Sequence, residues 1–413
     1  MKARIIGAAL LVAVLAIAAT SATGATKHHN ASITVWLQVD AQSGWPNVVA
    51  AANAAFKAKH PGVDVNVQYQ NWGTHLGKFD ATLAGGNAPD VIEMGNTEMT
   101  KYMAAGAFQD LSASKSVFDN SSTWLEGLAA SGRYNGKLLG VPYYAGSRVV
   151  TYRSDLFRQA GIRTAPKSVA QFTAAAKRLD GKFGKKGFSP VYLAGTDWYF
   201  AMSFVYDYGG QIARTAGGKW VGSLDSPKSV AGLTAFKKFF DASSKASKTA
   251  DENHPAPYDV YAQGGAASII GPGWFSCCVG NTYKASTAQF VMPSHIKGQP
   301  MPGFLGGSDL AVPAPSKNVA LAADWIKNFT GTDAERSLQQ KGNIPNATNL
   351  LGTSVNERAA ARSWFVPAAK HWVDVENGNI LRNMLAQILK GKLTVKQAAA
   401  SASDNITSVL NGS

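Results

Sequence analysis

The chain has 413 residues, of which 46% are hydrophobic, and its 40 Lys and Arg against 26 Asp and Glu give a formal net charge of +14. This hydrophobic content can bury a large core, which excludes wholesale disorder, and two cysteines are too few to hold such a chain together as a disulfide scaffold. The positive charge raises nucleic acid as a partner, but the lysines are dispersed rather than gathered in a basic helix or arm, so we expect no nucleic-acid binding.

The first 25 residues have the pattern of a secretory signal peptide. Lys2 and Arg4 precede an apolar run over residues 5–19, and small residues follow over 20–25. The run is shorter than the ~20 residues that a membrane-spanning helix needs. We therefore expect residues 1–25 to be removed and the protein to be exported, to a periplasm or a cell surface; an uncleaved anchor is the alternative. No cysteine lies near the cleavage region, so no lipid anchor is expected.

Strand and helix patterns alternate over the first hundred residues of the exported part. Buried or alternating apolar residues predict strands, and apolar residues at helical spacing predict the segments between them. This order is typical of βαβ units with a parallel sheet. The predicted strands cover residues 33–39, 63–67 and 90–94, and the predicted helices cover 45–59, 74–84 and 98–105.

The pattern changes near residues 141–144, where a second region begins. Its predicted strand at 149–152 is followed mainly by helices, and the tail over 380–410 is helical with an interruption at Gly391. No low-complexity linker separates the two regions, so we expect two α/β lobes. The other predicted helices cover 169–179, 198–208, 230–246 and 319–329, and a further strand is predicted at 310–312.

The common catalytic motifs are absent from the sequence. There is no phosphate-binding Gly-x4-Gly-Lys-Ser/Thr loop, no Gly-x-Ser-x-Gly elbow, no His-Glu-x-x-His and no Cys-His cluster suited to zinc. We therefore expect neither an enzyme nor a metal or organic cofactor. A pair of carboxylates of the kind that a glycosidase uses leaves no sequence motif, so a secreted carbohydrate-active enzyme stays open as an alternative.

Several of the ten tryptophans lie beside loops that end predicted strands. Trp72 follows the second strand, Trp198 follows Gly195-Thr196-Asp197, and Trp274 follows an apolar strand. In parallel α/β sheets, ligands bind outside the carboxyl ends of the strands. An aromatic ring there offers a flat face to the C–H face of a sugar, and neighbouring Asp, Asn and Gln can bond its hydroxyls. Packing in the core explains part of this pattern equally well.

An ordered series of segments resembles the extracellular solute-binding proteins of carbohydrate ABC importers, the group that includes maltose-binding protein. The resemblance covers nearly the whole exported chain, and its most specific block is GKLLGVPYYAGSRVVTYRSDLFRQAGI. The PYYAGSRVVTYR version is similar to binders of chitobiose- or xylobiose-type ligands. The other matching segments are ITVWLQVD, GGNAPDVIEMGNT, YDYGGQI, AASIIGPGW, LGGSDLAVPAPSKNVALAADWIKNFTG, GNIPN and GKLTVKQAA.

The resemblance implies a two-lobed α/β fold of the type II periplasmic-binding-protein class, with a ligand cleft between the lobes. It places residues 31–142 and 306–345 in the N-terminal lobe and residues 147–303 and 346–413 in the C-terminal lobe. It implies a monomeric receptor without catalytic activity, which captures a di- or oligosaccharide and delivers it to the permease subunits of an ABC transporter. Because Arg148 and Arg382 could serve an anion, a receptor for an anionic small solute is the other alternative.

The same resemblance assigns candidate ligand-binding residues. Trp274, after Gly271-Pro272-Gly273, matches the stacking tryptophan, although Gly273 is an insertion. Met94 replaces an aromatic residue of the family, which argues against a maltodextrin ligand. Trp36 fits the core as well as the cleft, and either Tyr143 or Tyr144 would face the cleft from the hinge. The candidates are Gln38, Asp40, Asn96, Thr97, Glu98, Tyr143, Asp197, Trp198, Tyr199, Trp274, Gly307, Ser308 and Arg382.

Cys277 and Cys278 are adjacent and follow Trp274 closely. In an oxidising compartment they could form a vicinal disulfide that stiffens the loop carrying Trp274. Two unpaired or buried thiols are the alternative.

Overall fold

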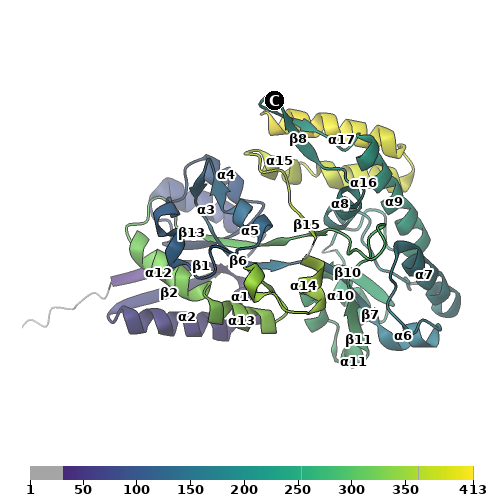
Figure 1. Ribbon diagram of the computed structural model, residues 1–413, viewed down its shortest axis with the longest axis horizontal. Coiled ribbons are helices and arrows are strands. Elements are labelled where there is room, and N and C mark those ends of the chain that lie inside the picture. The colour runs from purple at the N-terminus through teal and green to yellow at the C-terminus, as the bar shows by residue number, and fades with distance from the viewer. Residues whose placement is uncertain (1–30, 253, 361, 413) are drawn as a thin grey trace, which may run out of the picture.

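The computed structural model describes residues 31–252, 254–360 and 362–412, without the side chain of Cys277. The predicted signal peptide therefore lies outside the described residues. The chain forms two lobes that lie side by side, with the C-terminal helices at the top of the second lobe (Figure 1). Within the described part of the chain, no helix is both long enough and apolar enough to cross a membrane.

The N-terminal lobe is built on a six-stranded sheet with the order β14-β6-β13-β3-β1-β2. Strand β1 pairs in parallel with β2 and with β3, which confirms the predicted parallel βαβ start. Strand β13 then pairs antiparallel with both β3 and β6, so the sheet is mixed. The strands are β1 (Ala31–Gln38), β2 (Val63–Gln70), β3 (Val91–Gly95), β6 (Val141–Gly146), β13 (Gly306–Ala311) and β14 (Ile344–Pro345).

Successive side chains along each strand point to opposite faces of this sheet, so both faces carry apolar residues. Helices cover both faces. Ile33, Val35 and Leu37 point into a core with α2 and α12, whereas Trp36 points into a second core with α3 and α4. Trp36 is therefore a core residue. The helices are α2 (Pro46–Lys59), α3 (His75–Gly85), α4 (Met99–Ala104), α5 (Glu126–Ser131), α12 (Val319–Phe329) and α13 (Thr332–Gln340).

The C-terminal lobe packs its helices around an antiparallel sheet with the order β10-β7-β11. Its strands are β7 (Arg148–Arg153), β10 (Ser268–Pro272) and β11 (Thr287–Phe290). One hydrophobic core joins this sheet to the long helices and the tail (Figure 1). The long helices are α7 (Val169–Phe183), α8 (Trp198–Asp207), α9 (Pro227–Ser243), α16 (Ile380–Lys390) and α17 (Val395–Leu410).

Local signals explain where these helices begin and end. Thr394 and Gln397 form a capping box at the start of α17, and Gly391 ends α16 in the left-handed conformation with φ of 69°, which confirms the interruption predicted in the tail. The helix predicted at 230–246 begins earlier, because Ser226 caps it and Pro227 suits its first turn. The strand predicted through Val39 ends at Gln38, and a short helix α1 (Val39–Gly44) follows.

The remaining elements are short. They include two hairpins, β4–β5 and β8–β9, and the pair β12–β15. Their bounds are β4 (Arg133–Tyr134), β5 (Lys137–Leu138), β8 (Ala213–Ala216), β9 (Lys219–Gly222), β12 (Gly303–Phe304), β15 (Ser363–Trp364), α6 (Ser154–Gln159), α10 (Pro257–Ala262), α11 (Asn281–Lys284), α14 (Val355–Ala360), α15 (Trp372–Asn377), and the 3₁₀ turns η1 (Ser112–Val117), η2 (Gly273–Cys277) and η3 (Thr348–Leu350).

Three acidic side chains are buried inside the N-terminal lobe: Glu93 on β3, Asp309 on β13 and Glu335 on α13. Among the described residues, no lysine, arginine or histidine forms an ion pair with any of them. Burial disfavours the charged form, and it raises the pKa of Glu93 and the pKa of Asp309 to about 7 and the pKa of Glu335 well above its usual value.

These acids predict that the protein is more stable in mild acid than in mild base. A carboxyl group whose pKa is higher in the folded state stabilises it fully below the unfolded pKa, and this contribution is lost as pH rises through the folded pKa. For Glu93 and Asp309 the window is about pH 4 to 7, and each contributes on the order of 3 kcal/mol. The melting temperature should therefore fall by several degrees between pH 5 and pH 8.

The neutral substitutions Glu93→Gln and Asp309→Asn should each flatten that pH dependence. Asp404→Asn is the matched control, because Asp404 is exposed on α17. Calorimetric scans across the range check this prediction. An unchanged slope in both core variants would show that the buried acids do not set the pH dependence of stability.

Candidate functional site

The carboxyl ends of β1, β2 and β3 bring aromatic and acidic side chains together on the N-terminal lobe. The Trp72 indole Nε1 donates to Asp40 Oδ2 at 2.6 Å. The Trp72 ring remains 37% exposed although it lies against Gly95, where a Cβ would be 3.4 Å from the ring. The first parallel strands thus end at one edge, as the sequence predicts. Trp72 follows the second predicted strand but is not one of the candidate residues that the sequence gives.

His75 and Glu98 form an ion pair beside this indole. His75 Nε2 lies 2.9 Å from Glu98 Oε2, and His75 Nδ1 lies 3.0 Å from the Trp72 carbonyl oxygen. Both ring nitrogens face acceptors, an arrangement that favours the doubly protonated imidazole. Burial alone would lower the pKa of His75, but hydrogen bonding and the negative charge of Glu98 raise it. Glu98 is therefore held in place as a paired carboxylate, and its Oε2 also accepts from the Gly95 amide.

A buried polar layer lies beneath this surface. Gln38 is only 1% exposed, and its backbone N–H donates to Glu93 Oε2 at 2.8 Å. Ser308 is also buried, and its hydroxyl lies close enough to Glu93 and Tyr144 to lower the pKa of both groups, although burial raises each pKa more strongly. In this structure, Gln38 and Ser308 are therefore buried beneath the ends of the strands.

Three other candidates, Asn96, Gly307 and Tyr143, lie where the central strands pack against each other. Asn96 donates through its backbone N–H to the Gly307 carbonyl and through Nδ2 to the Leu305 carbonyl, both at 3.0 Å. A Cβ on Gly307 would lie 1.9 Å from the Tyr144 carbonyl oxygen. Tyr143 is 0% exposed, and its hydroxyl accepts from Trp45 Nε1 at 2.5 Å. Among these residues, Tyr143 and Asn96 lie in the interior of the structure.

Trp274 projects from the C-terminal lobe on the 3₁₀ turn η2. The ladder of β7 and β10 pairs Arg148 with Pro272, and the Gly273 carbonyl accepts from Gln289 Nε2 at 2.7 Å. Trp274 is 38% exposed and meets Phe275 edge to face with ring centroids 4.8 Å apart. A Cβ on Gly273 would overlap the side chain of Asn356, at 1.8 Å. The glycine before Trp274 thus lets the turn pack closely against α14.

Two arginines of the same lobe are each paired with a carboxylate. Arg382 on α16 donates two bonds to Glu252, at 2.7 and 2.6 Å. Arg148 Nε lies 3.5 Å from Asp197 Oδ2, and its guanidinium stacks over Tyr199 at 4.4 Å from the ring centroid. The two arginines and the two carboxylates balance in charge. This group of four side chains therefore offers hydrogen-bonding groups, and neither arginine in it is unpaired.

Tyr199 lies at the centre of this group. Burial raises the pKa of its hydroxyl well above the usual value, and Glu376, Glu252, Arg148 and Arg382 all lie near enough to act on it electrostatically. Trp198 is buried behind it and stacks on it with centroids 3.9 Å apart. Asp197 begins α8, where its side chain accepts from the Phe200 amide at 3.1 Å. The structure thus brings Asp197, Tyr199 and Arg382 together and places Trp198 in the core.

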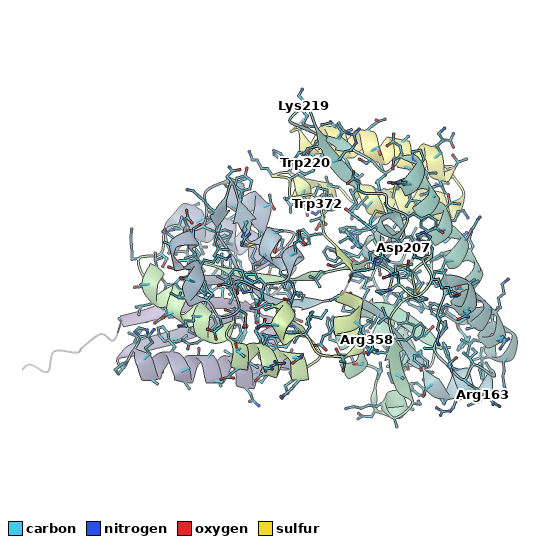
Figure 2. All side chains as sticks on the ribbon, in the orientation of Figure 1. Arg163, Asp207, Lys219, Trp220, Arg358 and Trp372 are labelled. Atoms are coloured by element: carbon cyan, nitrogen blue, oxygen red, sulfur yellow. The ribbon has the colours of Figure 1, made fainter. Side chains whose placement is uncertain are left out.

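Glu376 on α15 is a functional candidate that the sequence did not identify. Its Oε1 accepts from Trp372 Nε1 at 2.5 Å, and Thr97 of the other lobe lies close enough to bond its carboxyl group. Figure 2 shows Trp372 on the side of the C-terminal lobe that faces the N-terminal lobe. Thr97 thus lies where the two lobes meet. The local sequence around Glu376 carries no motif that could have revealed it.

The loop after Trp274 contains both cysteines. Cys278 is disulfide-bonded, and no free cysteine occurs among the described residues. The side chain of Cys277 lies outside the described part, so the predicted vicinal disulfide stays a prediction.

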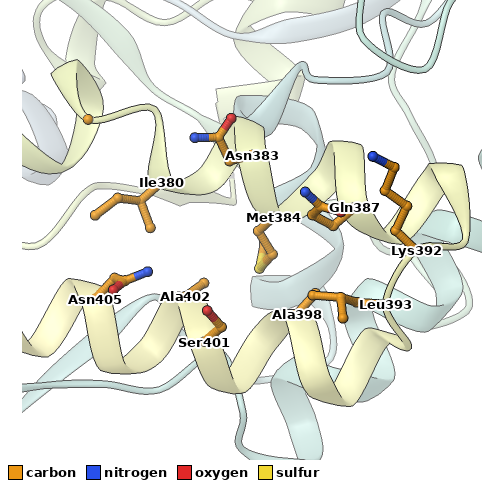
Figure 3. A pocket seen from close by; sticks show the side chains of 11 residues that line it. Ile380, Asn383, Met384, Gln387, Lys392, Leu393, Ala398, Ser401, Ala402 and Asn405 are labelled. Carbon is orange, nitrogen blue, oxygen red and sulfur yellow. The ribbon is translucent and has the colours of Figure 1, made fainter.

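A separate groove lies between α16 and α17 (Figure 3). Its lining includes the apolar side chains of Met384 and Leu393 and the polar side chains of Asn383, Gln387 and Asn405. None of the predicted ligand residues lines it. In the part of the chain that the structure describes, no cluster of three His, Cys, Asp or Glu residues is suited to a metal ion.

Comparisons with known proteins agree with this architecture. The family model described as bacterial extracellular solute-binding protein matches residues 37–336. The diacetylchitobiose binding protein DasA of Streptomyces coelicolor is 33% identical over 384 residues, covering 89% of this chain and 88% of that protein.

Solved structures share the fold at lower sequence identity. The GacH receptor of Streptomyces glaucescens, which was also solved in complex with acarbose, has a TM-score of 0.77 at 22% identity and covers 92% of this chain and 99% of its own. The sugar-binding protein MalE of Xanthomonas citri has a TM-score of 0.77 at 16% identity, with 92% and 98% covered. The two-lobed fold predicted from the resemblance is confirmed. The chain belongs to the family of bacterial extracellular solute-binding proteins.

Proposed function

We propose that the protein is the substrate-binding receptor of an ABC importer, which captures a di- or oligosaccharide between its lobes and delivers it to the membrane permease. The observation that carries this proposal is the pair of exposed tryptophans, Trp72 on one lobe and Trp274 on the other, each beside hydrogen-bonding groups. An indole ring covers the apolar face of a sugar, and Asp40, Glu98 and Asp197 can accept bonds from its hydroxyls.

The paired charges favour a neutral ligand over an anion. Arg148 and Arg382 are each engaged by a carboxylate, so neither is a free cation that would bind a phosphate or carboxylate ligand. The relative DasA is named for binding diacetylchitobiose, and that disaccharide is therefore the first ligand to test. We infer further that the receptor acts as an exported monomer, is cleaved near residue 25 and leaves its sugar chemically unchanged.

A thermal-shift screen tests the proposal. Mono- to tetrasaccharides, including N,N′-diacetylchitobiose, xylobiose and maltose, are compared with phosphate and simple amines. A ligand at about 100 times its Kd adds about 2.7 kcal/mol to the stability of the native state, so the bound sugar should raise the melting temperature by several degrees.

The same samples separate a receptor from an enzyme. Mass spectrometry of the sugar after long incubation should recover it intact. A screen in which no saccharide shifts the melting temperature while phosphate or an amine does would overturn the sugar assignment, and a cleaved oligosaccharide would favour the enzyme.

A further inference from the structure

Half of the formal net charge of the chain lies on one edge of the C-terminal lobe. Residues 153–190 hold nine Lys and Arg against two Asp, a surplus of seven positive charges out of the +14 of the whole sequence. This stretch forms α6, α7 and the loops around them, and Figure 2 shows Arg163 at the end of the lobe that lies away from the N-terminal lobe. The positive charge is therefore gathered here, contrary to the dispersal expected from the sequence.

Most of these cations have no acidic partner. The two acids of the stretch are both engaged, Asp155 with Arg153 and Asp180 with Lys245, which follows α9. Among the described residues, no acid forms an ion pair with the other eight cations, and all eight are exposed. Like charges that repel each other destabilise a compact fold, so folding does not explain this arrangement. We call these eight residues the basic edge: Arg158, Arg163, Lys167, Lys177, Arg178, Lys182, Lys185 and Lys186.

Cations of the basic edge line two hollows in the surface. The first lies beside α7, where Arg163 from the preceding loop and Arg178 from the helix share a hollow of about 260 Å³. The second lies beyond the C-terminal end of α7, where Lys185, Lys186 and the neighbouring Lys245 share a hollow of about 580 Å³. None of the described residues that line either hollow is acidic. Both hollows are thus suited to negatively charged groups.

Lys182 lies between the two hollows. It comes one helical turn after Arg178, and its Nζ donates to the carbonyl oxygen of Gln159 at 2.5 Å. The chain then turns at Gly184, where a Cβ would lie 2.3 Å from the Asp180 carbonyl oxygen, so a larger residue does not fit. This turn leads directly into the lysines of the second hollow. The cations therefore follow one another along α7, from the first hollow to the second.

We propose that the basic edge binds a linear polymer of phosphate groups, which runs along α7 from one hollow to the other. Lysine pairs with phosphate as a compact point charge and needs no fixed geometry, and five of the eight cations are lysines. A polymer fits better than a single phosphate because the cations are spread along the helix. Such a contact would hold an exported receptor at a phosphate-rich cell envelope by charge alone. The proposal uses none of the candidate sugar-binding residues, so it stands independently of the proposed function.

Two other polyanions fit this edge less well. Peripheral membrane proteins commonly add exposed apolar side chains to their cations. Among the described residues, none of the exposed large hydrophobic side chains belongs to residues 153–190. Single-stranded nucleic acid stacks its bases on exposed aromatic rings, but the rings that line the second hollow, Phe188 and Tyr192, are buried. A polymer of phosphate groups needs neither kind of contact.

Fluorescence anisotropy of end-labelled inorganic polyphosphate, titrated with the purified protein, tests the proposal. Neutralising phosphates releases their counterions, so the affinity should fall steeply with salt. If about four phosphates are neutralised, the affinity should drop about 50-fold between 50 and 200 mM salt. Inorganic phosphate at the same total phosphate concentration should not displace the polymer, because the affinity comes from several contacts acting together.

A triple variant tests whether the basic edge is the binding surface. Replacing Lys182, Lys185 and Lys186 by glutamine should weaken polyphosphate binding at least about tenfold at 50 mM salt and make the salt slope shallower by about two. The matched control removes the same charge from three scattered, exposed lysines and should bind about as the wild type does. Its substitutions are Lys317→Gln, Lys341→Gln and Lys396→Gln. Because all six lysines are exposed, both variants should keep the wild-type melting temperature.

The outcomes are distinct. A loss of affinity confined to the edge variant supports the proposal. The absence of polyphosphate binding, or equal affinities of the two triple variants, overturns it. Vesicles rich in phosphatidylglycerol and a labelled DNA duplex are titrated in parallel, and tighter binding to either would replace the phosphate polymer with a membrane or a nucleic acid as the partner. Displacement by inorganic phosphate would reduce the surface to a site for single anions.

Discussion

Replacing Trp274 by alanine should weaken saccharide binding at least tenfold, which corresponds to about 1.4 kcal/mol. Trp274 is one of the most exposed large apolar side chains of the described residues, and it packs against Phe275 in a T-shaped pair. Roughly 60 Å² of apolar contact with a sugar ring already accounts for that loss at about 25 cal/mol per Å². Calorimetric titration of wild type and variant measures it.

The matched control is Trp220→Phe. Trp220 lies on the hairpin β8–β9, where Asn411 at the end of α17 bonds its backbone, and it is not one of the candidate ligand residues (Figure 2). This variant should bind as the wild type does. Trp72→Ala should resemble Trp274→Ala, because Trp72 is the exposed ring of the opposite lobe. If Trp274→Ala keeps full affinity, Trp274 is not part of the ligand site.

Replacing Gly307 by alanine should cost the folded protein about 2 kcal/mol or more. The new methyl group would lie 1.9 Å from the Tyr144 carbonyl oxygen and 2.9 Å from the Ala145 Cα, both on the neighbouring strand β6. Backbone atoms cannot rotate away as a side chain does, so β6 and β13 must move apart, and overpacking of this kind typically costs 1–3 kcal/mol, sometimes more. Denaturant unfolding measures the difference.

Gly77→Ala is the control for that change. Gly77 lies within α3, and a Cβ there meets no heavy atom within 4 Å. Alanine favours a helix over glycine, so this variant should be as stable as the wild type or slightly more stable. Equal stability of Gly307→Ala and the wild type would mean that the strands separate at no cost, contrary to the packing described.

The elements of the fold follow from local sequence patterns to a large extent. The strands β1, β2 and β3 and the helix α12 occur where apolar periodicity predicts them, because their apolar residues pack into the cores of the N-terminal lobe. The mixed sheet was not predicted. Strand β13 joins it from residues more than two hundred positions after β3, and such pairing depends on the path of the chain between the lobes.

The positions of the candidate site residues were harder to predict from the sequence, for the same reason. The sequence places Gln38, Asn96 and Tyr143 near strand ends or the hinge, but their partners Glu93, Leu305 and Trp45 are distant along the chain and draw them inward. Arg382 pairs with Glu252, which lies 130 residues earlier in the chain. Side chains that stay exposed, such as Trp72 and Trp274, are distinguished from core tryptophans only once these long-range contacts are known.

The exposed tryptophans also give each lobe its own optical reporter. Trp72 lies edge to face with His75, with ring centroids 5.2 Å apart, whereas Trp274 contacts the rings of Tyr258 and Phe275. A sugar that covers either indole would change its emission. Stopped-flow fluorescence of Trp72→Phe and Trp274→Phe would therefore reveal which lobe the ligand meets first, and so the order of events between encounter and closure.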